Sequence, residues 1–321
     1  MINTSILAVD SYLPNKIVTN DALSEVVDTS DEWISTRTGI KKRHISTGEN
    51  TSELCINVGK RLLDKSNTHP DEIDLIIVAT ITPDYATPST ACIVQGALGC
   101  KNAFAFDLSA ACSGFVFALS VADKYIKSGI YKKIIVIGAE VLSKAIDWTD
   151  RSTCVLFGDG AGGVLLEGSS NAGIICEDLN SNGNDGLSLT SNYMPVNNIF
   201  NKEDADQYLH MDGKAIFNFA VKVVPSTINN LLAKANLTID DIDYIVPHQA
   251  NSRIINFVAR KLKTSIDKFY INIHDYGNTS AATIPIALSD MDKKGLLKKH
   301  SKIILVGFGG GLTWGSMLIQ L

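Results

Sequence analysis

Short apolar runs alternate with segments of helical periodicity along the whole chain. Unbroken apolar runs are typical of strands buried on both faces of a sheet, whereas apolar residues three or four positions apart predict helices. The expected strands cover 4–12, 73–78 and 133–138, and the expected helices cover 51–65 and 89–98. This alternation predicts an α/β protein.

The stretch 106–119 has a short apolar run, a cluster of small residues around Cys112 and a second apolar run at helical spacing. We interpret it as a strand, a tight turn and a buried helix. Small neighbours let another backbone approach Cys112 closely, and the unpaired N–H groups of a helix start favour a thiolate. Cys112 is therefore either a nucleophile or a small buried side chain, as most free cysteines are.

The second half of the chain repeats the first at a constant offset. Residues 71–76 (DEIDLI) match 240–245 (DDIDYI), and 133–138 (KIIVIG) match 302–307 (KIILVG), so that 240 − 71 and 302 − 133 both give 169. A repeat of this length predicts a duplicated α/β unit.

The duplication predicts two halves, residues 1–170 and 171–321. At the same offset the helix that begins at Cys112 corresponds to a helix that begins near Ala281. Two α/β units side by side would place these helices against each other, with the loops that follow the strands facing one cavity. The small residues at both helix starts also fit close helix packing alone.

Two polar residues fall at this expected cavity. His248 corresponds to Ala79 at a strand end, and Asn278 corresponds to Ser109 in the loop before the Cys112 helix. A single histidine is more often a structural residue, but this position facing a cysteine loop favours catalysis.

The glycine-rich stretch 307–311 follows a buried apolar run. It lacks the spacing of a dinucleotide-binding loop and the lysine of a P-loop, so we do not expect a nucleotide site. Its backbone N–H groups can stabilise an oxyanion, and its glycines equally suit a turn with positive φ.

The composition excludes several classes of protein. Of 321 residues, 45% are hydrophobic and 20% charged, and the net charge of −5 argues against binding of bulk nucleic acid. The six cysteines lack metal-ligand spacing, so neither a metal nor a disulfide framework is expected. No secretory segment or apolar run of about 18 residues is present, which predicts a cytoplasmic protein without a membrane span.

Several motifs together resemble β-ketoacyl-acyl-carrier-protein synthase III, and the match is ordered and runs essentially from end to end. They lie at 28–34 with 37–40, 111–115, 150–153 with 156–161, 248–251, 276–281 and 307–311. The resemblance implies a thiolase-like fold, a five-layered αβαβα arrangement built from two duplicated halves, usually in a homodimer.

The resemblance also implies a reaction in two stages. An acyl-CoA first acylates Cys112 and CoA leaves. Malonyl-acyl-carrier-protein then loses CO₂, and the carbanion attacks the thioester to give a β-ketoacyl-carrier protein, which starts fatty acid biosynthesis. Acyl-CoA is a substrate here, and no bound cofactor is implied.

The family's motifs imply roles for individual residues. His248 and Asn278 would donate hydrogen bonds to the malonyl thioester oxygen as the enolate forms, His248 through a neutral N–H. The N–H groups of Cys112 and Gly310 would form the oxyanion hole of the acyl-transfer steps.

By the same resemblance Trp33 and Arg151 would hold the adenine of CoA between them, and Arg37 would meet its phosphates. Taken singly, Trp33 fits helix packing and Arg151 a surface ion pair. Arg253, Lys214 and Lys261 match the basic surface that receives the acidic carrier protein, although the lysines equally suit a solvated helix face.

Four residues match walls of the acyl pocket: Thr87, Leu142, Phe157 and Leu209. Some relatives carry phenylalanine at the position of Thr87, where it closes the pocket from across the dimer. Threonine there predicts a roomier pocket that accepts branched or longer primers.

Two other functions are compatible with these residues. A thiolase-fold condensing enzyme or acyltransferase of a secondary-metabolite pathway would share the fold and the His/Asn pair. A cysteine hydrolase also uses Cys, His and Asn in this chain order, but the 169-residue repeat has no place in it.

Overall fold

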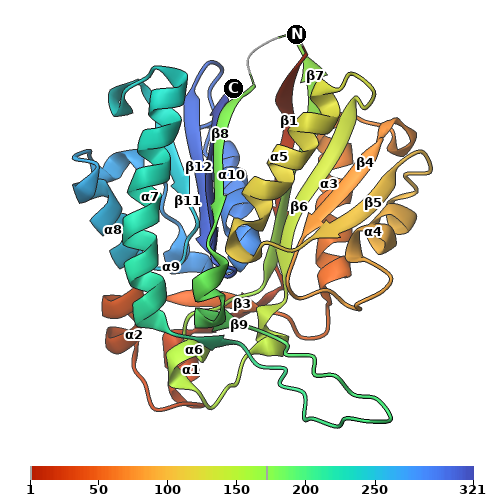
Figure 1. The fold of residues 1–321 in the computed structure, drawn as a ribbon. Coiled ribbons are helices and arrows are strands. Elements are labelled where there is room, and N and C mark those ends of the chain that lie inside the picture. Colours follow the sequence, from red (N-terminus) through yellow and green to blue (C-terminus); the bar gives the residue numbers. More distant parts are fainter. Residues whose placement is uncertain (1, 171–172) are drawn as a thin grey trace.

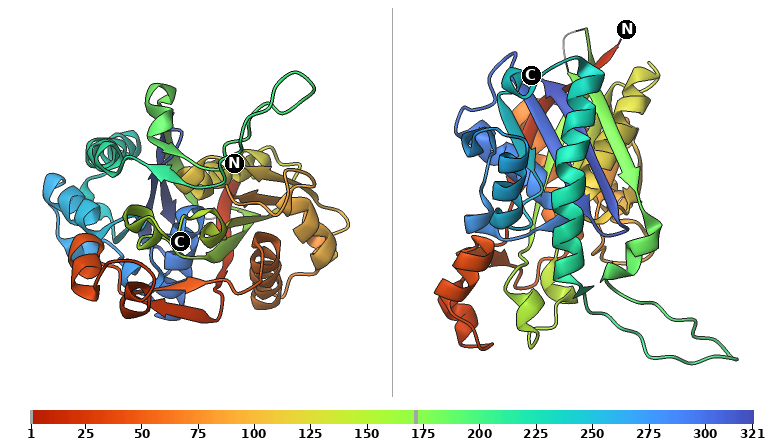
Figure 2. Two further views of the ribbon diagram at one scale, coloured as in Figure 1. Left: turned by 90° about the horizontal axis from the view of Figure 1, so that it is seen from below. Right: turned by 60° about the vertical axis from the view of Figure 1, so that its left-hand side comes forward.

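Two β-sheets enclose a central pair of helices, and further helices cover their outer faces (Figure 1). The computed structural model describes residues 2–170 and 173–321. The central helices are α5 (Gly114–Lys127) and α10 (Thr283–Lys293), and the outer helices are α3 (Thr51–Ser66) and α4 (Thr90–Leu98) on one sheet and α7 (Gly213–Ala235) and α8 (Ser252–Lys261) on the other. These five layers, seen also in Figure 2, confirm the predicted αβαβα fold.

The first sheet has five strands in the order β1-β7-β6-β4-β5, of which β6, β4 and β5 run parallel. Their bounds are β1 Asn3–Tyr12, β7 Gly160–Ser169, β6 Lys133–Glu140, β4 Leu75–Ala79 and β5 Phe104–Leu108. The strands and helices expected in this half are therefore present, with small differences at their ends.

The second sheet has four strands in the order β11-β12-β13-β8. They cover β11 Tyr244–Pro247, β12 Lys302–Gly309, β13 Thr313–Gln320 and β8 Ile174–Ser181. The expected boundary between the halves, after residue 170, adjoins residues 171–172, which lie outside the described residues. The division at that residue stays a prediction.

The predicted repeat extends to the backbone of the two central helices. The short 3₁₀ helix η2 (Ala111–Ser113) precedes α5, and η7 (Ser280–Ala282) precedes α10, again 169 residues later (280 − 111). Ala111 and Ser280 begin these turns with φ values of 45° and 48°, an unusual conformation for residues with a Cβ atom. We call each turn an elbow.

Each elbow packs against the sheet of the other half. A Cβ atom on Gly138 of β6 would overlap the backbone of Ala281, and one on Gly307 of β12 would overlap that of Ser113. Glycine is required at both strand positions because the backbones approach so closely.

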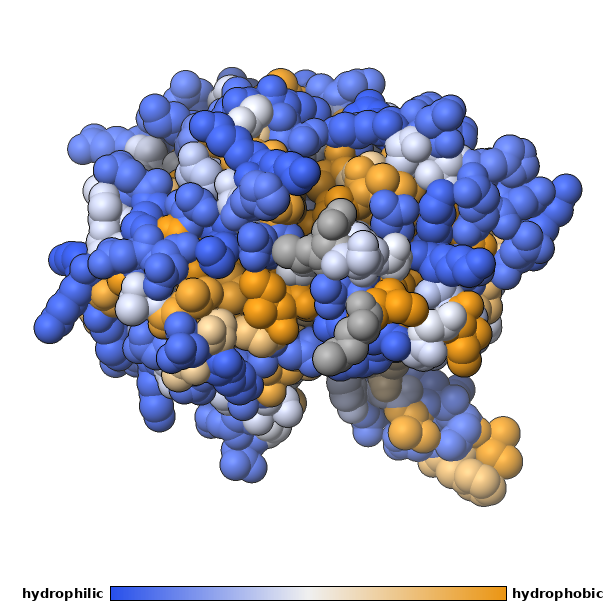
Figure 3. All heavy atoms as spheres, turned by 90° about the horizontal axis from the view of Figure 1, so that it is seen from above, coloured by the Kyte–Doolittle hydropathy of each residue, from blue (hydrophilic) through white to orange (hydrophobic). Residues whose placement is uncertain are grey.

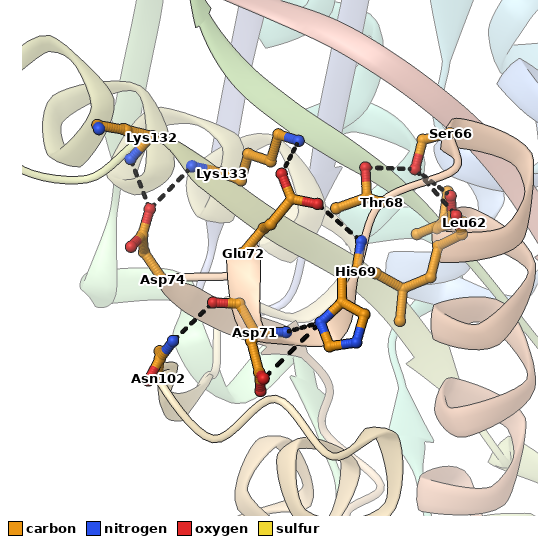
Figure 4. Close-up of polar contacts among 11 residues, drawn as sticks. Leu62, Ser66, Thr68, His69, Asp71, Glu72, Asp74, Asn102, Lys132 and Lys133 are labelled. Atoms are coloured by element: carbon orange, nitrogen blue, oxygen red, sulfur yellow. Dashed lines mark hydrogen bonds and ion pairs between the residues drawn. The ribbon is translucent and has the colours of Figure 1, made fainter.

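The repeated acidic segments fix the start of equivalent strands, and Figure 4 shows the first of them. The carboxylate of Asp74 accepts the N–H groups of Lys132 and Lys133 at 2.7 and 3.0 Å. Asp243 accepts that of Lys302 at 2.8 Å in the second half. Asp74 and Asp243 thus make equivalent hydrogen bonds, so the two halves share side-chain contacts as well as the path of the chain.

The smaller elements gather mainly at the lower end of the molecule in Figure 1. There lie β2 Lys16–Thr19, β3 Lys42–Ile45, α1 Asn20–Ser24, α2 Asp31–Thr38, α6 Arg151–Cys154, β9 Leu189–Thr190 and β10 His210–Met211. The remaining helices are α9 Ile273–Tyr276 and the 3₁₀ helices η1 Pro70–Glu72, η3 Leu142–Ala145, η4 Gly183–Ser188, η5 Ile239–Asp241 and η6 Ile266–Lys268. No described helix is long and apolar enough to cross a bilayer, and the cytoplasmic location stays a prediction.

Residues 191–209 join β9 to β10, and the middle of this segment projects from the body as an arm (Figures 1 and 3). A bridge between Tyr193 and Asp206 pairs its two branches, and Ile199 and Phe200 are 90% and 91% exposed. The base of the arm borders the cavity described next.

Candidate active site

A cavity of about 1,080 Å³ opens where β4 and β11 end, at the carboxyl edges of the parallel strands. Cys112, His248, Asn278 and Gly310 all line it. The duplicated topology thus places the expected catalytic residues of both halves in one cavity.

Cys112 lies in the first elbow, directly against the backbone of the second sheet. A Cβ atom on Gly309 would lie 3.0 Å from the Sγ of Cys112 and 2.7 Å from its Cβ, so a side chain at that position would displace the cysteine. Burial raises the pKa of the Cys112 thiol to about 12. The effect of burial on this pKa outweighs the opposite effect of the helix start, so the free thiol is protonated at neutral pH. The sequence pattern alone had favoured a thiolate.

His248 follows β11 and is buried with a fixed ring. Its backbone N–H donates to the carbonyl oxygen of Val306 at 2.7 Å, and the ring packs edge-on against Phe308, with centroids 5.1 Å apart. Burial lowers the pKa of His248 to about 3, so the ring is neutral at physiological pH. A neutral imidazole carries one N–H and offers one acceptor nitrogen.

Thr283 determines which ring nitrogen of His248 carries the hydrogen. Its hydroxyl oxygen lies 2.7 Å from Nδ1 of His248 and 3.0 Å from the carbonyl oxygen of Ser280. When the hydroxyl donates to Nδ1, Nε2 carries the hydrogen and is the ring's donor. When it donates to Ser280, Nδ1 holds the hydrogen and Nε2 becomes an acceptor.

The side chain of Asn278 is oriented by the second elbow. Its Oδ1 accepts the backbone N–H of Ser280 at 2.9 Å, and the backbone N–H of Asn278 donates to the carbonyl oxygen of Leu156 at 2.9 Å. Because Oδ1 is used in this way, the Nδ2 group is the part of the amide available to a ligand. Asn278 is thus a hydrogen-bond donor to the cavity.

The chain is similar to known proteins over its whole length. Models of 3-oxoacyl-[acyl-carrier-protein (ACP)] synthase III and of its C-terminal part match residues 106–183 and 232–321. A β-ketoacyl-[acyl-carrier-protein] synthase III of Clostridium acetobutylicum is 55% identical over 325 residues, which cover 100% of this chain and 99% of that protein. One of Lactococcus lactis is 54% identical, with 100% of both chains covered.

A crystal structure of 3-oxoacyl-[acyl-carrier-protein] synthase III from Aquifex aeolicus VF5 has a TM-score of 0.94 to this chain, at 45% identity, and the match covers 99% of this chain and 100% of that one. The chain belongs to the β-ketoacyl-acyl-carrier-protein synthase III family. It therefore has the fold of a condensing acyltransferase, and membership of this family excludes the cysteine hydrolase.

A second hollow of about 330 Å³ adjoins the cavity, and Trp33, Arg37, Lys214 and Arg253 line it. The two spaces share walls at Ser152, Leu156, Gly213, Phe217 and Asn251. Lys261 lies outside this hollow, farther along α8, where its Nζ donates to the carbonyl oxygen of Val221 at 3.3 Å. Two arginines and one lysine line the hollow, which is therefore a basic mouth of the cavity.

The ring of Trp33 is already in contact with two guanidinium groups. The Cζ atom of Arg37 lies 4.5 Å from its centroid and that of Arg151 lies 5.0 Å away. Arg151 also donates to the carbonyl oxygen of Asp28 at 2.8 Å. Since stacked planes are about 3.5 Å apart, a base between Trp33 and Arg151 needs roughly 7 Å, so the two side chains must separate to admit one.

The predicted walls of the acyl pocket divide into two groups. Leu142, Phe157 and Leu209 are buried and line the cavity. Thr87 is exposed and does not line the cavity of its own chain. Its predicted role therefore depends on a second copy of the chain.

Sequence reasoning missed three residues of this region: Glu140, Ser280 and Thr283. Thr283 carried no signal, because a threonine at the start of a buried helix is unremarkable. Glu140 is the one fully buried charged residue of β6. A carboxyl at the end of a strongly apolar strand is visible in the sequence and could have marked Glu140 as a candidate.

Proposed function

We propose that this chain transfers an acyl group from acyl-CoA to Cys112 and condenses it with malonyl-acyl-carrier-protein, as the first step of fatty acid biosynthesis. One observation carries the proposal. A cysteine, a neutral histidine and an amide with its donor group free line a single cavity, and that cavity joins a basic mouth.

In the acylation half-reaction, the sulfur of Cys112 attacks the thioester carbon of acyl-CoA. The carbonyl oxygen becomes an oxyanion, which the N–H groups of Cys112 and Gly310 would stabilise. The C–S bond to CoA breaks, the sulfur of CoA takes up the proton that the Cys112 thiol has lost, and CoA leaves through the mouth as its thiol. A sulfur nucleophile suits this step because it must later act as a leaving group.

In the condensation half-reaction, the malonyl C–C bond breaks and releases CO₂. Its electron pair becomes an enolate, whose oxygen accepts hydrogen bonds from the Nδ2 of Asn278 and, in the state in which the Thr283 hydroxyl donates to Nδ1, from the Nε2 of His248. Both donors are neutral and buried, so they stabilise the developing charge without competition from water. The carbanion attacks the acyl-Cys112 thioester, and the thiolate of Cys112 leaves.

Intact-protein mass after incubation with a panel of acyl-CoAs tests this function. We expect one acyl group per chain, and its discharge as a β-ketoacyl-carrier product when malonyl-acyl-carrier-protein is added. An acylated protein that malonyl-carrier does not discharge would favour an enzyme of a secondary-metabolite pathway with another acceptor. A protein that no acyl-CoA acylates would overturn the proposal.

Arg253 is proposed to receive the acidic carrier protein at the mouth. Arg253→Glu is expected to raise the KM for malonyl-acyl-carrier-protein by about 10-fold or more, because the residue would then repel the acidic carrier protein. The KM should also depend less on salt concentration, because an attraction that salt screens has been lost. The matched control is Lys60→Glu, which makes the same charge change at an exposed residue of α3 that lines neither the cavity nor the hollow. Equal effects of both variants would remove Arg253 from the docking surface.

We propose that the active form is a homodimer joined through β5. This strand is an edge of the five-stranded sheet, and Phe104 at its start is 38% exposed. The ring of Phe104 contacts Tyr125 and Tyr131, with centroids 5.6 and 5.3 Å apart. An apolar edge strand invites pairing, and a second copy offers the same edge. A solution mass near one chain of 34.6 kDa would contradict the dimer.

The proposed role of Thr87 follows from that dimer. Thr87→Phe is expected to lower acylation by branched or longer acyl-CoAs by about 10-fold relative to acetyl-CoA, because the ring fills space in the partner's pocket. Competition between acyl-CoAs, read by intact mass, measures the ratio. Leu142→Phe narrows the pocket from within the chain. If it shifts the ratio and Thr87→Phe does not, Thr87 is not a wall.

A further inference from the structure

The hydrogen bond between Thr283 and His248 has no counterpart in the first half of the chain. At the 169-residue offset His248 corresponds to Ala79 (248 − 79) and Thr283 corresponds to Gly114 (283 − 114). A Cβ atom on Gly114 would lie 3.1 Å from the Cβ of Ala79, so two small residues are in close contact at this position of the first half. The fold alone therefore does not require a polar pair here, which indicates that Thr283 serves His248.

The contacts of the Thr283 hydroxyl show where its hydrogen points. Its oxygen lies 2.7 Å from Nδ1 of His248, a length usual for a hydroxyl donor and short for an N–H donor. It lies 3.0 Å from the carbonyl oxygen of Ser280, at the long end for a hydroxyl donor. That carbonyl already accepts the backbone N–H of Thr283, whereas Nδ1 has no other partner among the described residues. The hydroxyl therefore donates to Nδ1.

This bond leaves the other ring nitrogen of His248 for the cavity. Burial lowers the pKa of His248 to about 3, so the ring is neutral and carries a single hydrogen. Because Nδ1 accepts the Thr283 hydroxyl, that hydrogen is on Nε2. The edge contact with Phe308 keeps the ring in this orientation. Nε2 makes no hydrogen bond within the described part of the chain, and His248 lines the cavity, so its N–H is available to a ligand.

We propose that Thr283 is a positioning residue whose hydroxyl holds His248 as an Nε2 donor for the condensation half-reaction, and this role rests on the proposed function. The enolate oxygen then meets two neutral donors, Nε2 of His248 and Nδ2 of Asn278. With the hydrogen on Nδ1, Nε2 would present a lone pair to the enolate and repel it. Acylation does not depend on Thr283, because the backbone N–H groups of Cys112 and Gly310 serve the oxyanion of that step.

The first test is Thr283→Val, which keeps the shape of the side chain and removes the hydroxyl. Rapid-quench mass spectrometry should show condensation slowed by about 10-fold, less than the roughly 10²- to 10³-fold of a lost oxyanion donor, because the tautomer with hydrogen on Nε2 stays accessible. The loss should appear in kcat and not in the KM for malonyl-acyl-carrier-protein, since the donor acts where charge develops. Acylation should match the wild type. Thr283→Ser restores the hydroxyl and should recover condensation.

Thr227→Val is the matched control. It removes another buried threonine hydroxyl of the second half, one that bonds to Asp178 and Ser316 at 2.9 Å and does not line the cavity. The two half-reactions should keep their wild-type ratio in this variant. If Thr283→Val slowed acylation as much as condensation, as the loss of a purely structural hydroxyl would, the positioning role would be refuted. Failure of Thr283→Ser to recover condensation would refute it too.

The second test observes the tautomer of His248 directly. Nitrogen-15 NMR of wild-type protein labelled in its histidine rings shows which ring nitrogen carries the hydrogen, and the signals of His248 are identified by their loss in His248→Ala. We expect the hydrogen on Nε2 and a bare Nδ1. A hydrogen on Nδ1 would overturn the proposal, whether or not Thr283→Val folds. A wild type that shows the expected tautomer but that no acyl-CoA acylates would instead refute the proposed function.

Discussion

Replacing Cys112 with alanine is expected to abolish acylation by acyl-CoA and to lower turnover on the order of 10⁴-fold or more. No other cysteine lines the cavity that the described residues form. The hydroxyls there are far weaker nucleophiles than a thiolate, because they lose their protons much less readily. Intact mass after incubation with acyl-CoA should show no adduct on the variant, and the malonyl-carrier reaction should give no β-ketoacyl product.

The matched control for this variant is Cys92→Ala. Cys92 lies on α4, is exposed and is absent from the cavity wall. We expect this variant to acylate as the wild type does, because its thiol has no access to the oxyanion site. Acyl transfer that persists in Cys112→Ala and disappears in Cys92→Ala would show that the nucleophile had been assigned to the wrong residue.

The sequence predicted the fold well because the repeat adds information that local patterns lack. Equivalent strands β6 and β12 begin at Lys133 and Lys302, as the repeat required. The repeat fails where tertiary context differs. The counterpart of β5 is helix α9 (Ile273–Tyr276), and the sequence match between the halves did not extend to that segment. In the second sheet β11, the counterpart of β4, is therefore the edge strand, with a single bridge from Ile245 to Phe269.

The site was predictable only in part, for a similar reason. The three catalytic candidates stand at strand ends or at the loop before a central helix, and topology alone brings such positions together. The polar groups behind them come from both halves, Glu140 from β6 and Ser280 and Thr283 from the start of the second central helix. Which side chains meet there depends on how one half packs against the other. No local pattern in the sequence records that packing.

Asn278→Asp is expected to separate the two half-reactions. Aspartate keeps the shape of the side chain and still accepts the N–H of Ser280, but it loses the Nδ2 donor and adds a negative charge beside the developing enolate. Condensation with malonyl-acyl-carrier-protein should fall by on the order of 10²- to 10³-fold, the cost of an oxyanion donor. Acylation of Cys112 should fall much less. Rapid-quench mass spectrometry follows both steps in one sample.

Asn102→Asp is the matched control, because it makes the same change in an exposed residue at the far end of the sheet (Figure 4). Both of its half-reactions should match the wild type. If Asn278→Asp slowed acylation as much as condensation, the added charge would be acting on Cys112, and the donor role would not hold. If condensation survived in full, the enolate would depend on His248 alone. The expected asymmetry arises because the amide donates only where charge develops, on the malonyl oxygen.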